Sequence, residues 1–134
     1  MSIRIVQLGS ERHSDEGLRL GTVRRPPRGV RKERLAEDDW YDVWLPQLAP
    51  SAELVKEAQS SQSPKAWQTF VRKYRAEMAA GDNERLVALL ASLSRDTNFS
   101  VGCYCDDEAH CHRSVLRELL IEHGARVEPD RSPR

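Results

Sequence analysis

Residues 98–123 read NFSVGCYCDDEAHCHRSVLRELLIEH, and this stretch decides the fold. It begins with an apolar, β-prone alternation over residues 99–105 and breaks at Asp106 and Asp107. It then resumes with apolar residues at helical spacing from Val115 to Leu120. The pattern predicts a strand, a turn and a helix. In an α/β protein such a junction exposes side chains at the carboxyl end of a strand, beside a helix N-terminus.

Side chains with reactive chemistry gather at this junction. The three cysteines of the chain, Cys103, Cys105 and Cys111, lie within ten residues together with two of its four histidines, His110 and His112. On a strand, Cys103 and Cys105 point the same way, so a disulfide between them would be strained. The odd number of cysteines also argues against a disulfide framework. We therefore predict reduced thiols that either bind a metal or react.

The N-terminal third predicts two short strands and a basic loop. The strands cover residues 3–8 and 18–23, and the segment RRPPRG at 24–29 forbids further regular pairing. Six basic residues lie between Arg24 and Arg34, where prolines fix the backbone. Such a loop could present guanidinium groups to an anion. It could equally be a solvated loop whose charge is cancelled by the acidic residues at positions 33–42.

Helices are predicted between the basic loop and the junction. One follows Ser51 as N-cap, and a second starts at Ser63-Pro64 with an apolar stripe from Trp67 to Met78. A third helix would be capped by Asp82 or Asn83. Its predicted buried residues are Leu86, Leu89, Leu90 and Leu93. The aromatic residues from Trp40 to Trp44 suit the core or the wall of a ligand pocket.

Strands that alternate with helices predict an α/β fold, a single-domain sandwich with a small, mainly parallel sheet of three or four strands flanked by helices. The length of 134 residues fits one domain, which we place at residues 1–128, with residues 129–134 as a flexible tail. Lys and Arg equal Asp and Glu at 21 each, which argues against a nucleic-acid partner. No apolar run approaches 18 residues, and the N-terminus lacks the apolar region of a signal peptide. We expect a soluble cytoplasmic protein without a membrane partner, and its oligomeric state is not predicted.

The order of four motifs resembles the DUF488 family, in particular its branch of YeaO-type proteins. The motifs are Arg25-Pro26-Pro27-Arg28-Gly29, the segment from Trp40 to Ser51, the helix from Trp67 to Glu77, and the C-x(7)-C-H-R pattern from Cys103 to Arg113. The resemblance spans nearly the whole chain and implies a compact α/β domain. It leaves the reaction open, because the family name records an undefined function. Members usually carry Glu two residues after the first cysteine, where this chain has Cys105.

The leading hypothesis for the junction is a pocket for a small anionic or phosphorylated ligand, with a reactive thiol. Cys111 stands at a helix start, whose positive end attracts an anion and lowers the pKa of a thiol. Cys111 would be the nucleophile, and His112 or His110 would move a proton. Arg113 would bind the ligand through its guanidinium fork. Arg25 and Arg28 would close over the ligand from the basic loop, and Cys103 would line the pocket.

Other interpretations remain open. No cofactor is favoured, but Zn²⁺ is possible through Cys103, Cys105, His110 and Cys111. Alternatively the cysteines belong to the core, Arg113 pairs with Asp106, Asp107 or Glu108, and the domain is a non-catalytic interaction module. The spacing HC-x(5)-R, which ends at Arg117, also occurs in cysteine phosphatases. We reject that match because the residues between are bulky and helical rather than a phosphate-binding loop.

Overall fold

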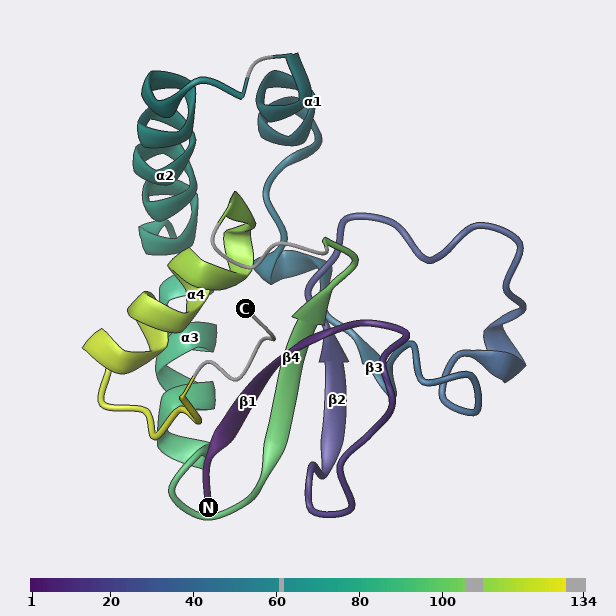
Figure 1. The fold of residues 1–134 in the computed structure, drawn as a ribbon. Helices are drawn as coiled ribbons and strands as arrows, with labels where there is room; N and C mark the ends of the chain where they lie inside the picture. The colour runs from purple at the N-terminus through teal and green to yellow at the C-terminus, as the bar shows by residue number, and fades with distance from the viewer. Residues whose placement is uncertain (61, 106–109, 130–134) are drawn as a thin grey trace.

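The computed structural model describes residues 1–60, 62–105 and 110–129, which form an α/β domain (Figure 1). Its strands are β1 (Ile3–Gln7), β2 (Leu18–Gly21), β3 (Val43–Trp44) and β4 (Phe99–Cys103). Its α-helices are α1 (Ala52–Ser60), α2 (Pro64–Ala79), α3 (Asp82–Leu93) and α4 (His112–Glu122). Two 3-10 turns, η1 (Lys32–Arg34) and η2 (Pro46–Leu48), lie on either side of β3. The single-domain α/β class predicted from the sequence is confirmed.

The strands form one parallel sheet in the order β1-β4-β2-β3. The strand of the decisive stretch, β4, is central and pairs Phe99 with Ile3 of β1 on one side and with Leu18 of β2 on the other. Every residue of β4 is buried. Since parallel strands end at the same edge, Cys103 lies where the carboxyl ends of β1, β2 and β4 meet.

The α-helices supply the apolar core on one side of the sheet. Figure 1 shows α2, α3 and α4 together beside the strands, with α4 between α2 and the sheet end of β4. The core joins strand residues such as Leu20 and Val101 to helix residues such as Tyr74 and Leu116. Helix α2 begins as predicted, because Ser63 caps it by accepting a hydrogen bond from Ala66 N at 3.1 Å and Pro64 occupies its first turn.

The opposite side of the sheet carries a buried ion pair. Arg19 of β2 donates to Glu16 at 2.7 Å, and the two side chains are 0% and 1% exposed. Ser100 of β4 also donates to Glu16, at 2.7 Å. Arg19 further donates to the carbonyls of Ser10 and Asp39, which anchors both covering loops to the sheet. Burial raises the pKa of Glu16, but the hydrogen bonds from Arg19 and Ser100 outweigh it and hold that pKa below its usual value.

Some local predictions were wrong. Helix α3 follows Gly81 rather than a capping Asp82 or Asn83, and its buried residues are Val87, Leu90 and Ala91. Leu89 and Leu93, which we expected in the core, are 53% and 39% exposed. The reason is that this helix is apolar on more than one face, so periodicity alone does not select the face that packs. The second strand ends at Gly21, two residues early.

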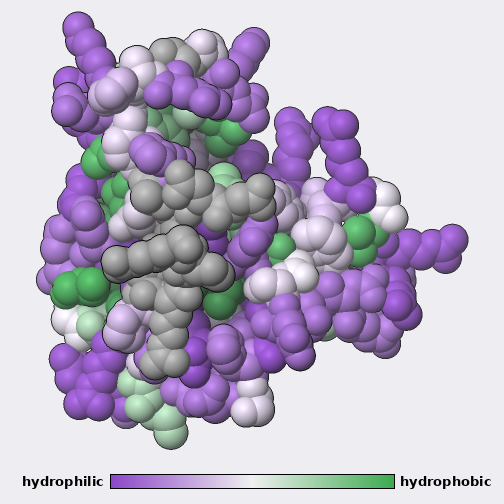
Figure 2. All heavy atoms as spheres, viewed as in Figure 1, coloured by the Kyte–Doolittle hydropathy of each residue, from purple (hydrophilic) through white to green (hydrophobic). Residues whose placement is uncertain are grey.

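The face of the molecule viewed in Figure 2 is mostly hydrophilic. On the face viewed in Figure 2, hydrophobic side chains of the described residues occur in small separate patches. Within the described ranges, no helix has the length and apolar character needed to cross a membrane. The tail predicted at 129–134 lies outside the described residues from position 130 onward.

Candidate functional site

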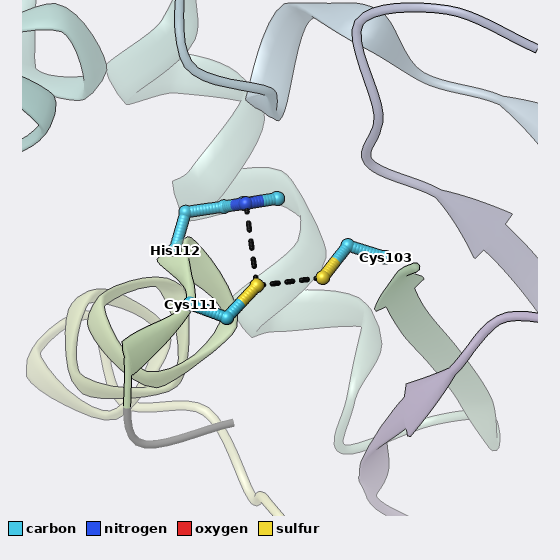
Figure 3. Close-up of side chains that lie close together, drawn as sticks. All are labelled: Cys103, Cys111 and His112. Atoms are coloured by element: carbon cyan, nitrogen blue, oxygen red, sulfur yellow. Dashed lines mark hydrogen bonds between the residues drawn. The ribbon is translucent and has the colours of Figure 1, made fainter. Parts of the chain in front are cut away.

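At the carboxyl edge of the sheet, the end of β4 and the start of α4 carry three cysteines, Cys103, Cys105 and Cys111, which we call the thiol cluster. Cys103 ends β4 and Cys111 is the residue before α4, and their Sγ atoms lie 2.7 Å apart (Figure 3). The Nδ1 atom of His112 lies 3.6 Å from the Cys111 Sγ atom. All three cysteines carry free thiols. Cys103, Cys111 and His112 therefore come together at the strand-to-helix junction, where the sequence predicted a candidate site.

The imidazole of His112 is fixed by the residue that follows β2. Its Nε2 atom lies 2.7 Å from the carbonyl oxygen of Thr22 and 3.3 Å from the Thr22 hydroxyl. A carbonyl oxygen only accepts, so Nε2 carries the hydrogen and Nδ1 presents its lone pair to Cys111. Burial lowers the pKa of His112 to about 4, so the ring is neutral at pH 7. His112 can therefore accept a proton from Cys111 or bind a metal through Nδ1.

Cys105 differs from the other two thiols because it is exposed. Strand β4 ends at Cys103, so Cys105 leaves the sheet instead of sharing a strand face with Cys103 as we expected. Hydrogen bonds from the thiols of Cys103 and Cys111 lower the pKa of Cys105 well below its usual range. A thiolate in the cluster is therefore favoured on its exposed member.

The pKa of Cys111 moves opposite to the sequence-based expectation. A hydrogen bond with Cys103 lowers the pKa of Cys111, but the hydrogen bond to Cys105 and burial outweigh it and give a net increase. The hydrogen bond to Cys105 likewise raises the pKa of Cys103. The position of Cys111 beside a helix start is as predicted, yet its thiol is 3% exposed and the cost of burying a charge prevails.

Arg113 supports the cluster from within. Its side chain is 4% exposed and donates to the carbonyl oxygen of Cys105. Its positive charge lowers the pKa of both Cys103 and Cys105. Pairing of Arg113 with residues 106–108 falls outside the described residues. Arg117, the last residue of the rejected phosphatase spacing, donates instead to the Glu128 carbonyl near the C-terminus.

The basic loop reaches the site through its backbone. The hydroxyl of Tyr104, the residue between the first two cysteines, donates to the carbonyl of Arg25 at 2.8 Å. The side chains of Arg25 and Arg28 are exposed. Arg24 is used differently, since it donates to the carbonyls of Ala49 and Pro50 and so holds the loop to the segment before α1.

The histidine that lies with the buried thiols is His112, whereas we expected His110 in a metal site. His110 packs edge-on against Trp67 of α2, with ring centroids 5.7 Å apart. The donor atoms that lie within 4.8 Å of one another belong to Cys103, Cys111 and His112. Thr22 was missed by the sequence analysis. Its only signal was a hydroxyl residue inside the strand predicted at 18–23, which does not indicate that it would hold a histidine.

The fold and the cluster together define a small parallel α/β protein whose thiols gather at the carboxyl edge of the central strand. Residues 3–124 match the family model described as "Active DUF488-N3 subclade". The chain belongs to the DUF488 family, as its motifs indicated, and the YeaO-type branch stays a prediction. Comparisons with curated proteins and with solved structures gave no match.

Proposed function

We propose that this chain is a thiol-based enzyme acting on a small anionic ligand at the thiol cluster. One observation carries the proposal: two buried thiols, Cys103 and Cys111, are in contact, one of them faces a neutral imidazole whose tautomer is fixed, and an exposed thiol, Cys105, follows two residues after the first. A structural core needs none of these features. The word "active" in the description of the matching family model supports a working site.

The geometry suggests a role for each group. Cys105 is the member that a ligand can reach, so it is the proposed nucleophile in place of Cys111. Cys111 and His112 keep a catalytic role as the pair that handles a proton, since the Cys111 Sγ atom lies 3.6 Å from the His112 Nδ1 atom. Arg113 holds the Cys105 backbone and is proposed as a positioning residue.

The anionic character of the ligand is proposed from the basic loop and the start of α4. Arg25 and Arg28 are exposed, and the Tyr104 hydrogen bond ties their loop to the residue beside Cys105. The first N–H groups of α4 add the positive end of a helix dipole at Cys111. The cytoplasm is the proposed location because three free thiols suit a reducing compartment.

The anion proposal is tested by alkylating the native protein with iodoacetate, which is negatively charged, and with neutral iodoacetamide. We expect the ratio of the two rates at Cys105 to exceed the ratio in the urea-unfolded chain by about 10-fold, as a cationic site enriches an anion near its surface. Replacing both Arg25 and Arg28 with Ala should return the ratio most of the way to the unfolded value. The readout is cysteine-resolved mass spectrometry.

A matched control removes a cation elsewhere. Arg85 of α3 has a side chain that is 87% exposed, and Arg85→Ala should leave the ratio unchanged. The anion proposal is wrong if the ratio of the iodoacetate and iodoacetamide rates is the same in native and unfolded protein and the Arg25→Ala and Arg28→Ala changes do not alter it. That result would favour the interaction-module alternative.

A second function is favoured by a separate observation, the convergence of metal-binding atoms. The Sγ atoms of Cys103 and Cys111 and a ring nitrogen of His112 lie within 4.8 Å of one another. Two sulfurs and one imidazole supply three of the four ligands of a structural Zn²⁺ site, and Cys105 is the nearest further thiol in the chain. The Thr22 carbonyl would serve as the outer partner that fixes the imidazole.

If the cluster holds zinc, protein purified with reductant and without chelator should contain one Zn²⁺ per chain, measured by elemental analysis. Cys103→Ser should lose the metal, because a thiolate ligand is removed. His110→Ala is the matched control and should keep it, since His110 faces Trp67. Folded wild-type protein that stays metal-free after incubation with a small excess of Zn²⁺ would exclude this function.

A further inference from the structure

The contact between Cys103 and Cys111 has a consequence beyond ligand binding or nucleophilic attack. Their Sγ atoms are 2.7 Å apart, about 0.7 Å more than the length of a disulfide bond. Both residues are held by regular structure, one at the end of β4 and the other directly before α4. A covalent bond between them therefore requires only a small displacement of side chains.

Neither partner of this close pair is open to a reagent. Cys103 is 2% and Cys111 3% exposed, so a molecule in solvent cannot reach either sulfur directly. Cys105 is exposed, follows Cys103 by two residues, and is held through its carbonyl oxygen by Arg113 at the start of α4. An exposed thiol next in the chain to a buried, bond-ready pair is the arrangement that thiol–disulfide exchange needs.

We propose that the thiol cluster is a two-electron redox centre that exchanges with small disulfides, in which Cys105 meets the substrate and the Cys103–Cys111 pair stores the oxidising equivalents. This inference does not depend on the charge of the ligand. It names thiol–disulfide exchange as the reaction and a low-molecular-weight disulfide as the substrate class.

The exchange balances in three steps. The Cys105 thiolate attacks the substrate disulfide, forms a mixed disulfide and releases the first substrate thiolate, which is then protonated. The Cys111 sulfur attacks the Cys105 sulfur and releases the second substrate thiolate, which takes up the Cys111 proton. Cys103 then attacks Cys111, which forms the Cys103–Cys111 disulfide and frees the Cys105 thiolate, while the Cys103 proton goes to solvent and replaces the one taken up by the first substrate thiolate. In sum, one substrate disulfide gains two electrons and becomes two thiols, and two protein thiols become one disulfide.

The His112 contact orients the Cys111 thiol for the second step. Cys111 is 3% exposed, and the Nδ1 lone pair of a neutral imidazole lies 3.6 Å from its sulfur, where it can accept a hydrogen bond from the thiol. The Thr22 carbonyl keeps that lone pair pointed at the thiol, because it holds the hydrogen on Nε2. The buried Arg113 cation favours thiolate forms in the same cluster.

The test incubates reduced, chelator-treated protein with oxidised glutathione, which is anionic, and separately with cystamine, which is cationic. Samples are quenched with acid, alkylated and mapped by mass spectrometry. We expect both reagents to give a Cys103–Cys111 disulfide with Cys105 left alkylatable. Cys105→Ser, at an exposed position that tolerates the change, should lose disulfide formation over the time in which the wild type completes it. Cys103→Ser should trap Cys105 as a mixed disulfide or paired with Cys111.

Three outcomes would overturn the proposal. They are wild-type oxidation that stops at a mixed disulfide on Cys105, a final disulfide that includes Cys105, and Cys105→Ser oxidation at the wild-type rate. If Cys103→Ser does not fold, Cys103→Ala gives the same readout without a buried hydroxyl. Preference between the two reagents reports on the anionic ligand alone, so redox exchange and anion binding can fail separately.

Discussion

The Glu16→Gln variant should lose about 3–5 kcal/mol of the free energy of unfolding at pH 7, the usual cost of removing one partner of a buried ion pair. Glu16 and Arg19 are 1% and 0% exposed, so the substitution leaves a buried guanidinium without its counter-charge. It also weakens the hydrogen bond from Ser100, which links the pair to the central strand. Urea unfolding followed by circular dichroism measures the change.

The same ion pair makes stability depend on pH. The pKa of Glu16 is lowered in the folded protein, so its contribution is complete above the unfolded value of about 4.3 and is lost as the pH falls through the folded value. The difference between wild type and Glu16→Gln should therefore shrink at acidic pH. Glu37→Gln is the matched control, because Glu37 pairs with Arg34 at a surface where the two side chains are 65% and 57% exposed. It should cost less than about 1 kcal/mol. Equal losses for both variants would show that the Glu16 ion pair is not buried in solution.

The Cys105→Ser variant should lose the fast phase of thiol alkylation, so that the remaining thiols react with iodoacetamide about 100-fold more slowly than wild-type Cys105 at neutral pH. The two remaining cysteines are 2% and 3% exposed, and reaching them requires a local opening that costs on the order of 3 kcal/mol. The rate of label incorporation in native protein, followed by intact mass, measures the effect.

Two controls separate access from damage to the fold. The unfolding midpoint of Cys105→Ser should match the wild type, since the side chain is exposed. In urea, the two cysteines of the variant should react as fast as those of the unfolded wild type. A fast phase that survives in native Cys105→Ser would mean that Cys103 or Cys111 is open to solvent, and the division of the cluster into one exposed and two buried thiols would fail.

The position of the site could be predicted from the sequence because its chemistry is local. Cys103, Cys111 and His112 are separated by a few residues, and the change from strand to helix periodicity between them places all three at one sheet edge. The parallel α/β class followed from the same alternation of strands and helices. The helix start at Ser63-Pro64 could also be predicted, since it depends on neighbouring residues alone.

What the sequence could not supply depends on contacts between distant segments. His112 rather than His110 joins the thiols because Thr22, ninety positions earlier, accepts its Nε2 hydrogen, while Trp67 receives the other ring. Strand β4 ends at Cys103 and Cys105 is exposed, whereas Cys111 is buried. The alternation of apolar residues in the sequence continues through residue 105, so it predicted a longer strand and did not show this difference between the thiols.

The Glu16–Arg19 pair was missed for a similar reason. Both residues lie in or beside a polar segment, which the sequence pattern assigns to the surface. The neighbouring residues do not indicate that the loops anchored by Arg19 cover that side of the sheet. Buried charges are rare, so a sequence pattern assigns them to solvent by default.

The most direct measurement for the thiol cluster is peptide-resolved alkylation of native wild-type protein with a limiting amount of iodoacetate. If Cys105 is the working thiol of an anion-binding site, it should carry nearly all of the label before Cys103 or Cys111 is modified, and it should take iodoacetate in preference to iodoacetamide when the two compete. Label that appears first on Cys111, or equally on all three cysteines, would contradict the account.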